Sequence, residues 1–519
     1  MGLAAIVIGP MAQRGWVLLL DWVTGPRAGY GERVVAGDSL PAGPVFFGFA
    51  AALQWVFGAA VGWLLPWTCL VLAGVGAARL VGRSLAAQLT AATAYLWNPF
   101  VHERLYSGQL AVLLGYAVLP YVAHAAATSL TRRSRGGLAC GLAWACAGAA
   151  SLHFLVLGAV VVIAFWIAHA VTSRRLAIGW LLSTTTVAAS ITAVWLLPII
   201  GDAPQAGDAR TIQAFATRPD PVLGLAGGVA AQRGFWRPSP GEPSSTNGWW
   251  WSATVGALGG AALVGLAVRG RREGHAVVLA VAIFAGVGWL LGQGGDGLVG
   301  PLFRTLADVP GFRIMREAGK FIALVSMAWA IGLGSFAETL FSRTPFAPTA
   351  VSRSRRSGSC TRLPVMAFGF AALPVLLSPG LASGVGGRLA AVRYPSEWTA
   401  LRAAVDSRPG GRVVVLPWLA YFDPGFTNHR VVKHPARAFF GRRAEVSDDA
   451  DVAGLAPSTR SVSIAAALTA SDGRALAVLG IGWVIGPDTP RPAAVRGAGF
   501  QIVFRRGGLA LYQNTAFQA

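Results

Sequence analysis

Three cations stand close together in the segment Pro310 to Phe321, PGFRIMREAGKF, directly before a long apolar run. If this segment is helical, Arg313, Arg316 and Lys320 lie at positions i, i+3 and i+7 and therefore share one face. An adjoining helix amino terminus, with its unpaired N–H groups, also favours anions. The spacing therefore predicts a phosphate site at a membrane surface. The alternative is that the three cations reach individually toward lipid headgroups.

A second polar segment, Asn98 to Gln109, reads NPFVHERLYSGQ and joins two apolar runs. It brings His102, Glu103 and Arg104 together, and Pro99 should end the helix before it. In one interpretation Glu103 is an acid/base or metal-binding group with His102 beside it. In the other, Glu103 and Arg104 form a local ion pair that fixes a turn. The chain has no ligand spacing that predicts a metal site, although a divalent cation remains possible as a cofactor.

Asp21 directly follows the apolar run WVLLL. An aspartate at the end of a membrane helix can be desolvated, which raises its pKa and suits a general base. The competing interpretation is that Asp21 only marks a helix terminus. Three histidines, His124, His153 and His169, lie on apolar runs, and we expect them to be packed or hydrogen-bonded core residues.

The composition indicates that these groups are positioned by membrane helices. Of the 519 residues 54% are hydrophobic and 13% charged, the mean hydropathy is +0.55, and soluble domains carry about 25% charged residues. The net charge of +21 comes from short arginine clusters between apolar runs, where they act as topology signals. We therefore expect membrane lipid, and no nucleic acid, as a partner.

About eleven transmembrane helices are predicted, since a bilayer core needs about 20 apolar residues per helix. Ten of them lie near residues 66 to 81, 84 to 99, 108 to 128, 137 to 152, 153 to 171, 176 to 199, 251 to 268, 275 to 292, 318 to 340 and 362 to 378. Residues 44 to 65 either span or form an interfacial helix. Five arginine clusters fall on one side of this arrangement, so the other side receives residues 100–107, 200–250, 293–317 and everything after about 379.

After about residue 385 the pattern changes to short β-rich runs near 412 to 418, 483 to 487 and 500 to 504. These runs alternate with helical and polar stretches, which is typical of a small α/β domain. We therefore predict an α-helical polytopic protein of the plasma membrane, with a transmembrane domain over residues 1–380. Residues 381–519 should form an extracytoplasmic α/β domain.

Three stretches carry a family resemblance: YLWNPFVHERLYSGQLAVLLGYAVLPY, FRIMREAGKF before a late span, and a tail that begins YPSEW and continues VVVLPWLAYF. Together they resemble the GT-C superfamily of membrane glycosyltransferases, including actinobacterial arabinofuranosyltransferases. The resemblance implies transfer of a sugar from a polyprenyl-phosphate donor to a glycan or lipid acceptor of the cell envelope. It also implies that Asp21 is the base in the first extracytoplasmic loop, and that Arg316 and Lys320 stabilise the departing phosphate. The first apolar stretch, MGLAAIVIGPM, is short for a first span of this kind.

Two other classes of protein remain open from the residues. A transporter or flippase of a lipid-linked precursor would use the same cations to hold phosphate, and should show inverted repeats and charges at the membrane midplane. A non-catalytic envelope assembly protein would use its terminal domain to recruit partners.

Overall fold

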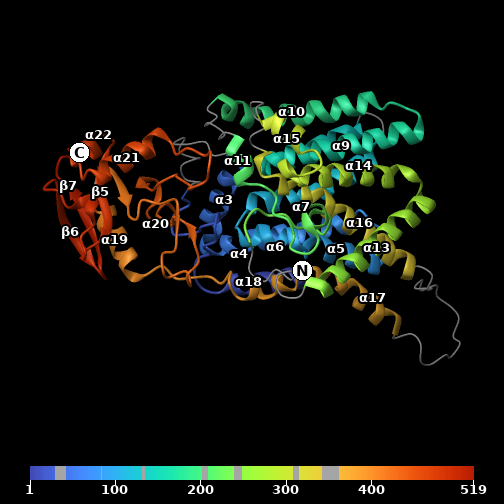
Figure 1. Cartoon of the computed structure of the whole chain (residues 1–519), viewed down its shortest axis with the longest axis horizontal. Helices are drawn as coiled ribbons and strands as arrows, with labels where there is room; N and C mark the ends of the chain where they lie inside the picture. Colours follow the sequence, from blue (N-terminus) through green and yellow to red (C-terminus); the bar gives the residue numbers. More distant parts are fainter. Residues whose placement is uncertain are drawn as a thin grey trace. The chain divides into compact units, whose positions relative to one another are not determined.

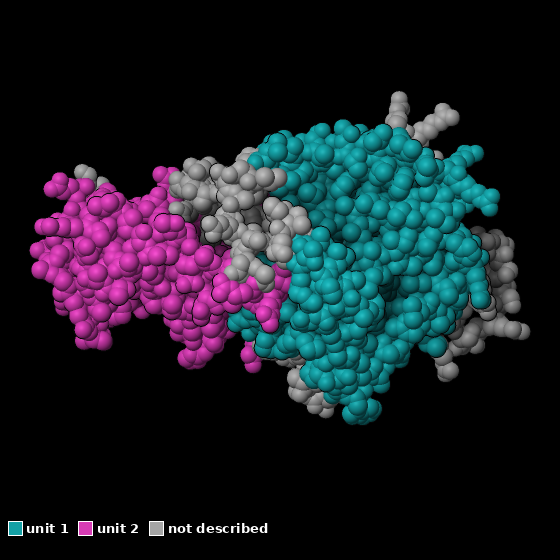
Figure 2. Space-filling view, turned by 45° about the horizontal axis from the view of Figure 1, so that its top comes forward, with its two compact units in different colours: residues 1–8, 66–202, 215–386 teal, residues 9–65, 203–214, 387–519 magenta. Residues whose placement is uncertain are grey.

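A computed structural model describes two compact units, drawn in different colours in Figure 2. Unit 1 comprises residues 1–8, 66–202 and 215–386, and unit 2 comprises residues 9–65, 203–214 and 387–519. The described residues are 1–29, 43–82, 84–130, 135–201, 209–238, 248–307, 315–341, 362–408 and 410–518. Each unit is described by itself.

Unit 1 is built from helices, most of which are labelled in Figure 1. They are α1 (Gly2–Ile8), most of α4 (Val61–Ala78), α5 (Leu85–Leu96), α6 (Pro99–Tyr106), α7 (Leu110–Ser129), α8 (Arg135–Ala150), α9 (Leu152–Ser173), α10 (Ile178–Gly201), α12 (Gly224–Ala230), α13 (Gly248–Glu273), α14 (His275–Gly292), α15 (Gly300–Ala307), α16 (Ile322–Phe341), α17 (Arg362–Ala372) and α18 (Ala382–Gly386). The α16 helix packs against α5, α13 and α14. It is the most buried of the candidate spans, with 83% of its apolar window inside the protein.

The local sequence explains where the polar segment between α5 and α7 bends. Ser84 caps α5 by accepting a hydrogen bond from the Ala87 amide, and α5 ends at Leu96. Asn98 then caps α6, whose first residue is Pro99, because a proline at this position loses no helical hydrogen bond. The predicted helix end before Pro99 is confirmed.

The predicted fold class is confirmed: a multi-pass helical membrane region is followed by a mixed α/β region. In the described part of the chain, seven helices are long and apolar enough to cross a membrane, or eight if the bent pair Val365–Leu377 and Pro379–Gly386 is one span. This count is below eleven because two predicted spans fall on shorter helices and because the predicted segments 44–65 and 66–81 form one stretch of 35 residues, Pro44–Ala78. The α5 helix has 12 residues and α8 has 16, against about 20 for a full span.

Two contacts within unit 1 join segments that the arginine clusters assign to the same side. Arg269 donates a hydrogen bond of 2.7 Å to the Leu80 carbonyl, between two arginine-bearing segments. Thr217, in the segment 200–250, donates a hydrogen bond of 2.6 Å to the carbonyl of Gly292, the last residue of α14. The side of the membrane that each segment faces stays a prediction.

Unit 2 contains a five-stranded sheet in the order β4-β1-β5-β7-β6. Its strands are β1 (Arg412–Val415), β4 (Ala444–Glu445), β5 (Ile481–Pro487), β6 (Phe500–Arg506) and β7 (Leu509–Asn514). The β4, β1 and β5 strands are parallel, whereas β7 is antiparallel to both β5 and β6. Three predicted β-rich runs thus coincide with β1, β5 and β6.

Helices cover both faces of this sheet. Neighbouring residues of β1 point to opposite sides, so they belong to two separate cores. Val413 and Val415 belong to a core formed with α19 (Ser396–Asp406) and α20 (Ala436–Phe440). Val414 belongs to a second core with α21 (Thr459–Thr469) and α22 (Gly473–Val478). The unit also contains α3 (Pro44–Phe57), α11 (Ala209–Ala214) and the small hairpin of β2 (Tyr421–Phe422) and β3 (Val432–Lys433).

Candidate functional site

A buried carboxylate in unit 1, Glu317, gathers three donors, two of which come from a distant part of the sequence. Its Oε2 lies 2.8 Å from Lys320 Nζ, and its Oε1 forms an ion pair with Arg104 Nη1. Gln109 Nε2 approaches both oxygens at 3.4 and 3.5 Å. The side chains of Arg104, Glu317 and Lys320 are only 0%, 8% and 11% exposed. We call Arg104, Gln109, Glu317 and Lys320 the charge cluster.

Arg104 is held rigidly by its neighbours. Its guanidinium lies 5.2 Å from the Phe100 ring centre and 4.6 Å from that of Phe235, which are favourable cation–π distances. Its Nη1 also donates to Gln109 Oε1 at 2.8 Å. Among the described residues, its buried Nε and Nη2 atoms have no hydrogen-bond partner. Buried donors are normally satisfied, so these two unpaired donors are unusual.

Lys320 joins the charge cluster to a third helix. Its Nζ lies 3.2 Å from His153 Nε2, at the start of α9. A charged lysine has only donors, so this nitrogen of His153 acts as the acceptor. His153 is hydrogen-bonded, as expected, but it is half-buried and not a core residue.

In the described part of this cationic segment, residues 315–321, the expected α-helical face does not form. Lys320 lies in the 3-10 turn Ala318–Phe321, and α16 begins only at Ile322. Arg316 lies with its guanidinium 5.1 Å from the Phe215 ring centre, and burial lowers its pKa. Arg313 falls outside the described residues.

Glu317 was not among the predicted site residues, although it is the centre of the charge cluster. Burial by itself would raise the pKa of its carboxyl, but the charges of Lys320 and Arg104 outweigh burial and lower the pKa to about 2. Glu317 is therefore ionised at neutral pH. One sequence signal pointed to it: an acid three residues before Lys320, in a stretch otherwise rich in cations.

Glu103 and His102 point to other partners. The Glu103 carboxylate accepts hydrogen bonds from the amides of Gly234 at 3.4 Å and Phe235 at 3.1 Å, while His102 Nδ1 lies 2.9 Å from Ser378 Oγ. Arg104 forms its ion pair with Glu317, which is distant in the sequence. This pair differs from the local Glu103–Arg104 pair of the second interpretation. In the part of the chain that the structure describes, no three His, Cys, Asp or Glu side chains are grouped to hold a metal ion.

Asp21 belongs to unit 2, where Tyr421 donates a hydrogen bond of 2.9 Å to its Oδ1. The run before it is extended and not a membrane helix, so the expectation of a helix terminus is wrong. Trp16 pairs with Val392, with N···O distances of 2.8 and 2.9 Å, and Leu18 is buried against Val392. The apolar residues thus complete a protein core and leave Asp21 in the turn that follows. Its convergence with the charge cluster stays a prediction.

No family model and no curated protein sequence matches this chain. Solved structures, in contrast, do match it. The cryo-EM structure of the arabinofuranosyltransferase AftD from Mycobacteria matches with a TM-score of 0.60 at 14% identity, over 99% of this chain and 39% of that one. Its R1389S mutant, class 2, also has a TM-score of 0.60, at 16% identity over 99% and 41% of the two chains. ArnT from Cupriavidus metallidurans, bound to undecaprenyl phosphate, matches at 14% identity over 99% and 97%, but with a TM-score of only 0.48.

The two AftD matches establish the fold. The chain has a GT-C-like fold, which it shares with the arabinofuranosyltransferase AftD, as the sequence resemblance implied. It spans about two fifths of the length of AftD, so the match covers one portion of that protein.

Proposed function

We propose that this chain is a membrane glycosyltransferase that transfers a sugar from a polyprenyl-phosphate donor to a glycan or lipid acceptor of the cell envelope. The fold shared with AftD supports the class of reaction. The charge cluster is the observation that supports an anionic donor. In this proposal, residues 381–519 and the segments 100–107, 200–250 and 293–317 face the extracytoplasmic side.

The charge cluster has the donors that a phosphate monoester or diester needs. Arg104 and Lys320 together carry two positive charges against the one negative charge of Glu317. Arg104 keeps two buried N–H donors without partners in the described part of the chain, and guanidinium donors match phosphate oxygens in geometry. Arg316, four residues before Lys320, supplies a third cation. These groups would stabilise the negative charge that grows on the phosphate as it leaves.

Asp21 is the proposed general base. The acceptor hydroxyl oxygen attacks the anomeric carbon and its proton passes to the Asp21 carboxylate. The bond between the anomeric carbon and the phosphate oxygen breaks, and the electron pair stays on polyprenyl phosphate. Tyr421 orients the base through its hydrogen bond. Glu103, whose carboxylate is bound by two backbone amides, holds α6 against the loop at Phe235 and thereby positions Arg104.

Transfer of labelled sugar from polyprenyl-phosphate donors, by the full chain in nanodiscs, tests this proposal. We expect Asp21→Asn to lower the turnover about 100-fold or more, the usual contribution of a general base, while Tyr421→Phe lowers it much less. Equal turnover by wild type and Asp21→Asn would overturn the role of Asp21. Binding of the donor without any transfer would instead indicate a transporter.

The anion site is tested separately, without turnover. Wild-type protein should bind a polyprenyl phosphate at least about tenfold more tightly than the polyprenol of equal length, since charge-assisted hydrogen bonds contribute about 1.5–3 kcal/mol each. Lys320→Gln should remove most of this difference. Equal affinity of the wild type for the phosphate and the alcohol would overturn the anion site.

A further inference from the structure

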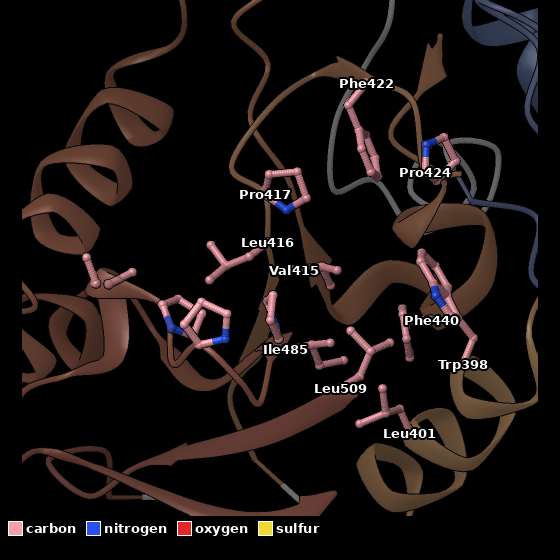
Figure 3. Close-up of a pocket in the computed structure, with 15 residues that line it drawn as sticks. Trp398, Leu401, Val415, Leu416, Pro417, Phe422, Pro424, Phe440, Ile485 and Leu509 are labelled. Carbon is pink, nitrogen blue, oxygen red and sulfur yellow. The ribbon is translucent and has the colours of Figure 1, made fainter. Parts of the chain in front are cut away.

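A pocket of about 560 Å³ opens at one edge of the unit 2 sheet (Figure 3). Val415 ends β1 and Ile485 lies near the end of the parallel strand β5, so both reach the pocket from the carboxyl ends of their strands. Trp398 and Leu401 of α19 and Phe440 of α20 line another wall. Open α/β sheets bind ligands at the carboxyl ends of their strands. The volume of the pocket lies in the range of about 300–1,000 Å³ typical of ligand pockets.

The lining defines the chemistry of the occupant. All 15 described lining residues are Trp, Phe, Leu, Ile, Val, Pro or Ala. Such walls provide no charged side chain to pair with a phosphate and no carboxylate or amide side chain to match sugar hydroxyls. Burying those polar groups without partners would be unfavourable. A hydrocarbon, which has no hydrogen bonds to lose, suits this lining.

The mouth of the pocket is apolar as well. Four lining residues are exposed, Pro417, Pro487, Pro490 and Ala493, and Leu419, which follows Pro417 closely, is 49% exposed. The floor is buried, since Val415 and Leu401 are 2% and 0% exposed. Contiguous exposed apolar surface usually marks an interaction site. A hydrocarbon chain that enters across this rim therefore meets apolar surface throughout.

The position of these residues in the chain favours a lipid as the source of that hydrocarbon. The bent apolar helix pair ends at Gly386, and the pocket wall begins with Trp398 soon afterwards. A domain tethered so closely to a membrane segment meets lipid at a high effective concentration. We propose that this pocket binds one aliphatic chain, acyl or isoprenoid, of a membrane lipid. This proposal holds whether or not the chain transfers sugar.

Photocrosslinking of the full chain in nanodiscs tests the pocket, with diazirine analogues of palmitate and of farnesol as probes. Neither probe carries phosphate or sugar, so the result is independent of the donor site. We expect adducts on peptides that contain residues 415–424 and 485–494. An excess of unlabelled palmitate or farnesol should suppress them in the wild type, and the stronger competitor identifies an acyl or an isoprenoid occupant.

Ala493→Trp fills the mouth from an exposed position and should lower the pocket adducts about tenfold or more, because each excluded methylene weakens binding about fourfold. Ala403→Trp is the matched control: Ala403 is exposed on α19 and does not line the pocket, so its adducts should equal those of the wild type. Pocket adducts that survive Ala493→Trp would overturn the proposal. So would a proline-rich peptide that binds the pocket while neither lipid probe labels it.

Discussion

Replacing Glu317 by glutamine keeps the shape of the side chain but leaves Arg104 and Lys320 without their counter-charge. Arg104 is 0% and Lys320 11% exposed, so water cannot replace the lost carboxylate. Breaking a buried ion pair in this way costs about 3–5 kcal/mol. The lowering of the Glu317 pKa from 4.5 to about 2 corresponds to about 3 kcal/mol. Both routes therefore predict a loss of roughly 3 kcal/mol or more in the free energy of unfolding.

Equilibrium unfolding of the full chain in mixed micelles, titrated with a denaturing detergent and followed by tryptophan fluorescence, measures this loss. Glu273→Gln is the matched control. Glu273 pairs with Arg269 at 2.8 Å, one helical turn away, but is 51% exposed, so its removal should cost only about 0.3–0.5 kcal/mol. If Glu317→Gln destabilises the protein no more than Glu273→Gln does, the charge cluster does not contribute as we have reasoned.

Two further predictions concern the same cluster. Because the pKa of Glu317 is lowered to about 2, its ionisation stabilises the folded chain fully above about pH 4.5, and this contribution is lost as the pH falls toward 2. The difference in unfolding free energy between wild type and Glu317→Gln should therefore be constant near neutrality and shrink below pH 4.5. A difference that grows on acidification would contradict the lowered pKa of Glu317. Gly319→Ala should destabilise by about 1–3 kcal/mol, since a Cβ there would lie 2.8 Å from the Gly234 carbonyl oxygen and 3.1 Å from Arg104 Nη2. Gly256→Ala is the control, because Gly256 lies on α13 and nothing lies within 4 Å of the new Cβ. This substitution should be neutral or stabilise the protein by up to about 1 kcal/mol. Equal effects of the two substitutions on the free energy of unfolding would show that the close approach at Gly319 does not matter.

Hydropathy predicted the helical region well because membrane helices satisfy their own backbone hydrogen bonds and need apolar side chains over a set length. It could not separate full spans from shorter helices such as α5. That helix is apolar and ends at Leu96, but it packs against α16 inside unit 1. Apolar composition alone does not distinguish burial in protein from burial in lipid.

The run WVLLL illustrates the same ambiguity. Five apolar residues before Asp21 suit the end of a membrane helix, yet the segment is extended because Trp16 pairs with Val392, which is distant in the sequence. No local pattern records a pairing partner so far along the chain. The turn that carries Asp21, and its hydrogen bond from Tyr421, follow from that pairing.

By itself, the sequence determined the membrane-spanning class, the α/β domain after residue 385, and the two polar segments that carry Arg104 and Lys320. Only the tertiary structure decided that these cations meet on Glu317, since that contact joins residues 213 positions apart in the chain. The physical reason is that hydrophobicity and helix caps act over a few residues and can be recognised locally. Charge pairing inside a protein depends on which distant backbones pack together, and therefore on the whole fold.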